Sequence, residues 1–146
     1  MLKKSLALIL VIFTVFACTV FSYAATDVTV LINGVKIEYD VPAQIIGDRT
    51  MVPMRKTFDM LGANVDWNSE MRLAIATYKT SIIAIGIDCD SFTVTDVING
   101  TVTEYKLDVP AQIVDGRTLI PLRAVSQALG KKVEWNGSIS TALIND

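Results

Sequence analysis

The chain has 146 residues, of which 51% are hydrophobic and 19% charged, and its formal net charge is −2 at pH 7. It contains no histidine, which excludes the usual base of a catalytic triad and the commonest zinc ligand. Because no run of lysine and arginine exceeds two adjacent residues, we expect no nucleic-acid partner.

The N-terminus has the order of a secretory signal peptide. Two lysines precede an apolar run at residues 6–16, and small residues suited to a signal peptidase follow. This order predicts a signal peptide at 1–24 and a secreted domain at 25–146, with no membrane span left after cleavage. Two alternatives stay open: a lipoprotein acylated at Cys18, and an uncleaved membrane anchor.

The first predicted element of the secreted domain is a β-hairpin. Two β-rich runs, Val28–Ile32 and Val35–Tyr39, flank Asn33-Gly34. Asn-Gly between such runs predicts a type I′ turn, because both central residues of that turn need positive φ. The Ile-Asn-Gly triplet returns at residues 98–100, ahead of another β-rich run at 102–107.

An internal repeat follows the hairpin. Residues 40–68 and 108–136 align without a gap at an offset of 68, and 15 of the 29 positions are identical. With the flanking strands included, the repeats cover about 28–78 and 94–146. We therefore expect two copies of one structural unit that share a core.

Each repeat is predicted to contain one short helix. Apolar residues over Met54–Leu61 recur at i, i+3, i+4 and i+7, which places them on one helical face. Pro53 suits the first helical position, and Gly62 suits a left-handed stop. Pro121–Gly130 repeats this plan, so each helix should have about two to three turns.

Strands are predicted after each helix. Residues 73–78 and 82–87 are predicted to form a hairpin, 92–97 a strand, and 141–144 a strand after the Asn136-Gly137 turn. The predicted fold class is α+β, with antiparallel β-sheets packed on two short helices and built from two sequence repeats in one domain.

The pattern NG…DVPAQI…RTMVPMR…LG…V.WN, present twice, resembles the copper amine oxidase N-terminal-like domain, or stalk domain, of secreted bacterial proteins. Its most specific part lies at Arg49–Gly62 and Arg117–Gly130, and the resemblance covers roughly Val28 to Ile144. It implies a small antiparallel sheet curved around a helix, used as an accessory module. Oxidase chemistry is excluded here, because the copper of the separate catalytic domain is held by histidines and this chain has none.

Few groups in the chain suit catalysis. Cys89 lies between Asp88 and Asp90, whose charges oppose thiolate formation, so we expect a small side chain near a strand end. A dimer linked through Cys89 stays open. The acidic pairs Asp88/Asp90 and Asp66/Glu70 are interpreted as solvated turn residues, with carboxylate hydrolysis or a weak calcium site as alternatives.

Trp67 and Trp135 raise a carbohydrate-binding hypothesis, because the face of an indole stacks on a sugar ring. Each tryptophan shares a strand face with a valine two residues earlier, Val65 or Val133. That spacing favours a tryptophan packed on the helix of its own repeat, which is our prediction.

Arg55 and Arg123 follow the prolines that open the predicted helices, where an arginine opposes the helix dipole. Each needs a compensating partner, and we predict ion pairs with the duplicated Asp40 and Asp108. The alternative is an anion-binding site for a wall polymer or phosphate.

Two glycosylation sequons begin at Asn99 and Asn136, and both are interpreted as hairpin turns. With no catalytic, cofactor-binding or metal-binding residue predicted, the sequence favours a secreted, non-catalytic structural or binding module. It would act at the cell surface or extracellularly, in contact with a protein or a cell-wall polymer. The alternative is a small extracellular carboxylate-dependent hydrolase. The sequence leaves the oligomeric state open.

Overall fold

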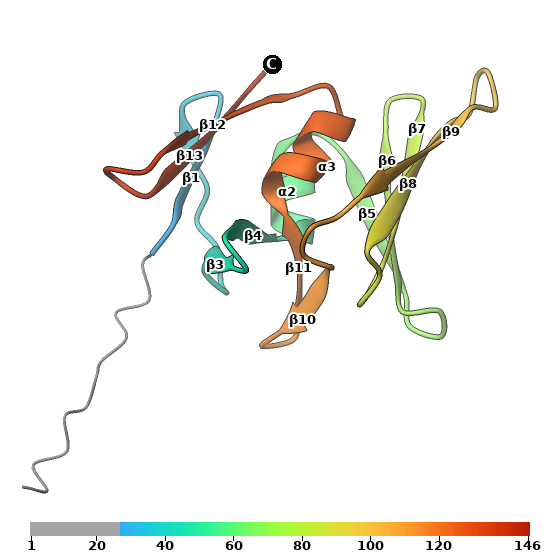
Figure 1. The fold of residues 1–146 in the computed structure, drawn as a ribbon. Coiled ribbons are helices and arrows are strands. Elements are labelled where there is room, and N and C mark those ends of the chain that lie inside the picture. Colours follow the sequence, from blue (N-terminus) through green and yellow to red (C-terminus); the bar gives the residue numbers. More distant parts are fainter. Residues whose placement is uncertain (1–26) are drawn as a thin grey trace, which may run out of the picture.

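The computed structural model describes residues 27–146, so the predicted signal peptide and Cys18 lie outside the described residues. Three β-sheets surround two short helices (Figure 1). Almost every strand pair is antiparallel, in agreement with the predicted α+β class. None of the helices in this part of the chain has the length and apolar composition that crossing a bilayer needs.

The central sheet consists of two hairpins that pair edge to edge. Its strand order is β10 (Gln112–Val114), β11 (Arg117–Pro121), β4 (Arg49–Pro53), β3 (Gln44–Ile46). Val52 lies opposite Ile120, which is its own counterpart at the offset of 68. On either side of it, Met51 pairs with Pro121 and Pro53 pairs with Leu119. A shift of 68 residues converts one of these two pairs into the other, so this register has local twofold symmetry.

The strands of this central sheet were not predicted from the sequence. Both hairpins turn over two residues with positive φ, Gly47-Asp48 and Asp115-Gly116. Positive φ at both central positions is the requirement of a type I′ turn, and Asp-Gly is one of its preferred dipeptides. The Asp115-Gly116 dipeptide therefore carried a hairpin signal that our interpretation of the sequence overlooked.

Two further sheets flank the helices on opposite sides in Figure 1. One has the order β5 (Asn64–Asn68), β6 (Leu73–Tyr78), β7 (Ser81–Gly86), β8 (Ser91–Asp96), β9 (Val102–Lys106), and is antiparallel throughout. The other has the order β12 (Lys132–Asn136), β13 (Thr141–Asn145), β1 (Thr29–Ile32), β2 (Val35–Lys36). In this second sheet β1 and β13 are parallel, so the two ends of the described chain lie side by side.

The first hairpin forms around the predicted turn. Asn33 and Gly34 both have positive φ, at 48° and 81°, as a type I′ turn requires. The second strand ends at Lys36, earlier than the predicted Tyr39, because the chain then leaves the sheet and crosses to the central one.

The helices are α2 (Met54–Met60) and α3 (Leu122–Ala128), each about two turns long. Pro53 and Pro121 precede their helices as the last residues of β4 and β11, so the prediction of proline at the first helical position was wrong by one residue. A proline still suits this junction, since its φ near −60° fits both an extended strand and the entry to a helix. Gly62, at φ 84°, follows α2 as predicted.

A single large core joins all three sheets to both helices. Phe58, on α2, is fully buried in it, whereas the corresponding position on α3 is the small residue Ser126. A smaller apolar cluster of Met51, Val109 and Leu119 packs separately.

One buried contact of the core is polar in the first repeat and apolar in the second. The hydroxyl of Thr57 donates to the Pro53 carbonyl oxygen at 2.8 Å, and the Tyr39 hydroxyl lies 2.8 Å from the same Thr57 oxygen. The corresponding residues of the second repeat are Leu107 and Val125, both buried. Burial raises the pKa of Tyr39 to about 12, and its hydrogen bond with Thr57 opposes this only in part.

Candidate functional site

The acidic residues around Cys89 do not form a site. Asp88 and Asp90 lie in the connection between β7 and β8, and both side chains are exposed, as expected of solvated turn residues. Asp88 pairs with Arg72 at 3.1 Å, and Asp90 pairs with Lys106 at 3.7 Å. The two carboxylates are thus held by different partners.

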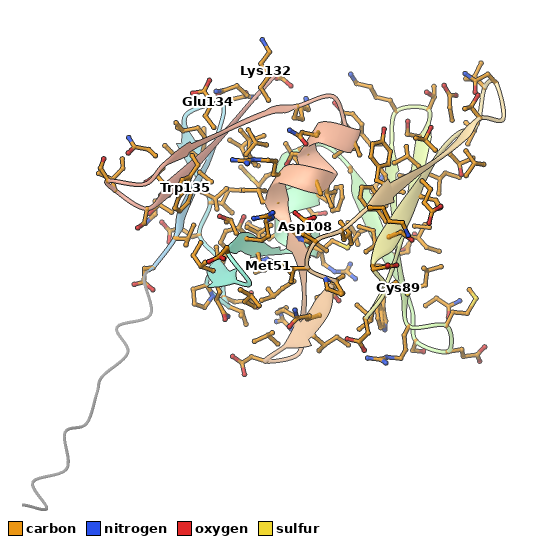
Figure 2. The ribbon with its side chains drawn as sticks, viewed as in Figure 1. Met51, Cys89, Asp108, Lys132, Glu134 and Trp135 are labelled. Atoms are coloured by element: carbon orange, nitrogen blue, oxygen red, sulfur yellow. The ribbon has the colours of Figure 1, made fainter. Side chains whose placement is uncertain are left out.

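Cys89 is an exposed free thiol, on the opposite side of the molecule from Trp135 in Figure 2. Its sulfur packs where Gly86 has no side chain, since a Cβ built there would lie 2.6 Å from the Cys89 sulfur. This position fits the predicted small side chain near a strand end. In residues 27–146, histidine, cysteine and acidic residues form no group of three or more that could hold a metal ion.

The two tryptophans are not packed into the core. Trp67 is 39% exposed and Trp135 is 40% exposed, so the prediction of a tryptophan packed away on its helix was wrong. Each stands on an edge strand, β5 or β12, beside the helix of its own repeat. Figure 2 shows the side chains of Trp135 and Glu134 on opposite sides of β12.

The arginine–aspartate pairing also differs from the prediction. Asp40 accepts from Nε of Arg117 at 2.7 Å, and Asp108 accepts from Nε of Arg49 at 2.9 Å. Each ion pair therefore joins one repeat to the other, and the two pairs are equivalent to each other at the offset of 68. Arg55, predicted as the partner of an aspartate, instead donates from Nη1 to the Val65 carbonyl oxygen at 3.1 Å.

One open cavity, which we call the first groove, has a volume of about 740 Å³. It lies between the start of α2, strand β5 and the β10–β11 hairpin. It is lined by Glu38, Asp40, Pro53, Met54, Arg55, Lys56, Asp59, Val65, Asp66, Trp67, Ala74, Ile113, Gly116, Arg117 and Thr118. Of the predicted acidic pair Asp66/Glu70, only Asp66 lines it.

The second groove is an open cavity of about 580 Å³ between the start of α3, strand β12 and the β3–β4 hairpin. It is lined by Ile45, Asp48, Arg49, Thr50, Lys106, Asp108, Pro121, Leu122, Arg123, Ala124, Gln127, Val133, Glu134, Trp135 and Ala142.

The two grooves are equivalent position by position. Each of the 15 lining residues of the first groove lies 68 positions from a lining residue of the second. Nine of the 15 residue types are identical, and the tryptophan, the arginine at the helix start and the cross-repeat ion pair are among them. Each groove takes its helix and tryptophan strand from one repeat and its hairpin from the other, so neither repeat forms a groove alone.

Six positions differ between the grooves, and four of these differences change the charge. Glu38, Lys56, Asp59 and Gly116 of the first groove correspond to Lys106, Ala124, Gln127 and Asp48 of the second. The first groove is lined by four acidic and three basic residues, and the second by three of each. Neither groove therefore has a strong net charge.

The ion pair also limits the chemistry of the grooves. The hydrogen bond from Arg117 lowers the pKa of Asp40, and the Val41 backbone N–H lowers it further. A carboxyl group held in its charged form does not suit the general acid of glycoside hydrolysis, whose pKa must be raised. Asp40 therefore does not suit the role of general acid.

Sequence reasoning found the tryptophans, Arg55, Arg123 and the aspartates, but it missed the hairpin residues of each groove. Ile45 and Ile113, 43% and 48% exposed, and the arginines Arg49 and Arg117 come from the strands that were not predicted. The available signal was the repeated Gln-Ile and Arg-Thr on either side of the Gly-Asp or Asp-Gly turn.

Comparison with known families gives one match. The family model of the copper amine oxidase N-terminal domain matches residues 31–144, which include every lining residue of both grooves. No curated protein matches the chain.

Proposed function

Because the chain belongs to the copper amine oxidase N-terminal domain family, we propose that it is a non-catalytic module that works outside the cell by binding a macromolecule. The family is a non-catalytic, stalk-like domain. The partner would be a protein or a cell-wall polymer, and the predicted signal peptide at 1–24 would deliver the domain to it.

The proposal includes a fold made of two copies of one unit related by an approximate twofold axis. Supporting it, β3, β4, α2 and β5 have the same bounds as β10, β11, α3 and β12 after a shift of 68 residues. The twofold register of β4 and β11 would place the axis at the Val52–Ile120 pair.

The observation that carries the binding role is the equivalence of the two grooves. Each groove presents a partly exposed tryptophan, an exposed isoleucine and an ion pair in the same arrangement. Exposed apolar side chains in a concave, partly polar site are typical of ligand binding.

The test is capture of a partner by the grooves. Protein purified from cells expressing the full chain is immobilised and exposed to cell-wall fragments and, separately, to secreted proteins of its own source. A double variant, Ile45→Asp with Ile113→Asp, places a charge in each groove at positions that are 43% and 48% exposed, so the fold should be kept.

We expect the double variant to lose capture and the control Ile98→Asp to retain it, because Ile98 is 78% exposed and lines neither groove. Capture that is equal in both variants would show that the grooves are not the binding site.

Export is tested separately. N-terminal sequencing of the protein recovered from the medium should begin at Ala25, since cleavage is predicted after Ala24. Full-length protein found only inside the cell would contradict the extracellular role. A membrane-bound form that begins at Cys18 would support the lipoprotein alternative.

A further inference from the structure

We propose that each groove is a saccharide-binding site in which Trp67 or Trp135 stacks on a sugar ring, so that one molecule holds two segments of a repeating glycan. This inference rests on the proposed binding role and names the class of ligand.

The stacking surface is present in both grooves. Each indole is about 40% exposed although it lines a concave site, and the isoleucine of the other repeat's hairpin lines the same groove. The C–H groups on one face of a pyranose are apolar and flat, so they can cover an indole face while the hydroxyl groups at the ring edge stay polar. Aromatic side chains combine a large apolar area with such specific geometry.

Polar groups for the ring edge lie in the same grooves. Arg55 uses one of its five N–H donors on the Val65 carbonyl oxygen and keeps the others for a ligand. The Asp40–Arg117 pair presents acceptors and donors side by side, and its geometry is fixed by Nε and Nη2 of the arginine. A sugar hydroxyl both donates and accepts, so this mixed set suits neighbouring hydroxyl groups.

The charge of the grooves favours a neutral ligand. Acidic and basic residues nearly balance in the first groove and balance in the second. A polyphosphate or polyanionic wall polymer would need a clear excess of lysine and arginine to replace its counterions. A neutral polyhydroxylated chain has no such requirement.

A peptide is the competing ligand, because edge strands β5 and β10 border the first groove and could accept an added strand. Two observations favour the glycan. Arg55 already occupies the Val65 carbonyl oxygen of β5, which removes an acceptor that a peptide strand would use. Two equivalent sites on one chain also fit a ligand that repeats, as a polysaccharide does and a single peptide sequence does not.

The chain offers a direct reporter for the test. It contains two tryptophans, one in each groove, so fluorescence excited at a wavelength that tyrosine does not absorb reports on the grooves. Purified protein is titrated with four neutral hexasaccharides: β-1,4-glucan, β-1,4-linked N-acetylglucosamine, α-1,4-glucan and β-1,4-mannan. We expect at least one of them to change the emission in a saturable way.

Variants then assign the response to each groove. Trp67→Ala leaves only the emission of Trp135, and Trp135→Ala leaves only that of Trp67. Loss of stacking should weaken binding at the altered groove by about tenfold, measured by calorimetry, and Trp→Phe should restore part of it. Met71→Ala, at a residue that is 63% exposed and outside both grooves, should bind like the unchanged protein.

The outcomes separate this inference from the proposed function. No response to any of the four hexasaccharides, with capture of wall fragments or secreted proteins still lost in the Ile45→Asp, Ile113→Asp variant, would overturn the saccharide assignment and leave the binding role intact. Binding of an extended hexapeptide pool that depends on both tryptophans would likewise assign the grooves to peptides. Absence of both sugar binding and capture would overturn both proposals.

Discussion

Residues 40–78 and residues 108–145 begin with similar sequences and form the same series of elements, but they complete their sheets with different partners. Strand β6 of the first segment pairs antiparallel with β7, which follows it directly in the chain. Strand β13 of the second segment pairs in parallel with β1, more than one hundred residues away in the sequence. Similar sequences thus specify similar local elements, while chain connectivity selects the strand that covers the edge.

The sheet that contains β6 and the sheet that contains β13 have similar strand arrangements if β7 is left out of the comparison. In the first, β6 and β8 both run antiparallel to β7, so they are parallel to each other, and β8 continues into β9. In the second, β13 lies directly against a parallel β1, and β1 continues into β2. The N-terminal hairpin therefore takes the place beside the second segment that β8 and β9 take beside the first. The comparison suggests four experiments, given from the largest expected effect to the smallest.

The first experiment removes the N-terminal hairpin, residues 27–36. Val30 and Ile32 are buried in the core, and each contributes roughly 1.5–3 kcal/mol by burial alone. Deletion would also expose the edge of β13, so we expect loss of most of the ~5–15 kcal/mol that stabilises a domain of this kind. Thermal unfolding followed by circular dichroism should show no cooperative transition.

The control for this deletion is Val35→Ser, at a residue of the same hairpin that is 56% exposed, and it should unfold almost as the unchanged protein does. A deletion variant that stays monomeric and unfolds within a few degrees of the parent would show that the second segment does not depend on β1.

The second experiment compares matched positions of the two helices. Phe58→Ala empties a fully buried ring position on α2 and should lower the free energy of unfolding by about 3–5 kcal/mol. Ser126→Ala, at the corresponding position of α3, removes one oxygen and should change it by less than about 1.5 kcal/mol. Urea unfolding measures both, and equal effects would mean that the core does not distinguish the two helices.

The third experiment converts a polar contact of the first repeat into the apolar contact of the second. Thr57→Val leaves the partly buried Tyr39 hydroxyl without its partner and should cost about 1–3 kcal/mol. The double variant Tyr39→Leu, Thr57→Val copies Leu107 and Val125 and should recover most of that loss. Failure of the double variant to recover would indicate that the two repeats pack differently here.

The same tyrosine predicts a dependence on high pH. The pKa of Tyr39 is raised from 10.0 to about 12, so the folded protein keeps its proton more tightly than the unfolded chain does. The associated stability is complete below pH 10 and is lost as the pH rises from about 10 towards 12. Urea unfolding at several pH values should show this decrease, and Tyr39→Leu should reduce it.

The fourth experiment concerns the ion pairs between repeats and has the smallest effect, because Asp40 and Arg117 are exposed. Arg117 lowers the pKa of Asp40 below its ordinary 3.8, so the pair stabilises the fold above about pH 3.8 and this contribution is lost as the pH falls. An NMR titration should show the Asp40 pKa rising in Arg117→Gln. An unchanged pKa would show that the pair does not form in solution.

The local elements were largely predictable from the sequence. The Asn33-Gly34 turn and the glycine after each helix were predicted from residue types that readily adopt positive φ. Both helices were predicted from the spacing of their apolar residues. The β3–β4 and β10–β11 hairpins were not predicted, because their strands are only three to five residues long. The second strand of each hairpin also ends in a proline, which is typical of a helix start.

The grooves were predictable only in part. Trp67 and Trp135 were identified as candidates, but their alternation with valine suggested burial, and nothing local indicates that an edge strand leaves the indole open. Asp40 and Asp108 were expected to pair with Arg55 and Arg123 of their own repeats. Their actual partners, Arg117 and Arg49, belong to the other repeat, which a search within each repeat could not find.

The sequence by itself determined the repeat, the turns, the two helices and the absence of histidine chemistry, because each depends on the identity and spacing of neighbouring residues. Only the tertiary structure decided that β1 would complete the sheet of β13 and that each groove would draw on both repeats. The grooves depend on the pairing of β4 with β11, which brings residues 68 positions apart into contact. Such a long-range contact cannot be predicted from the residues on either side of it in the sequence.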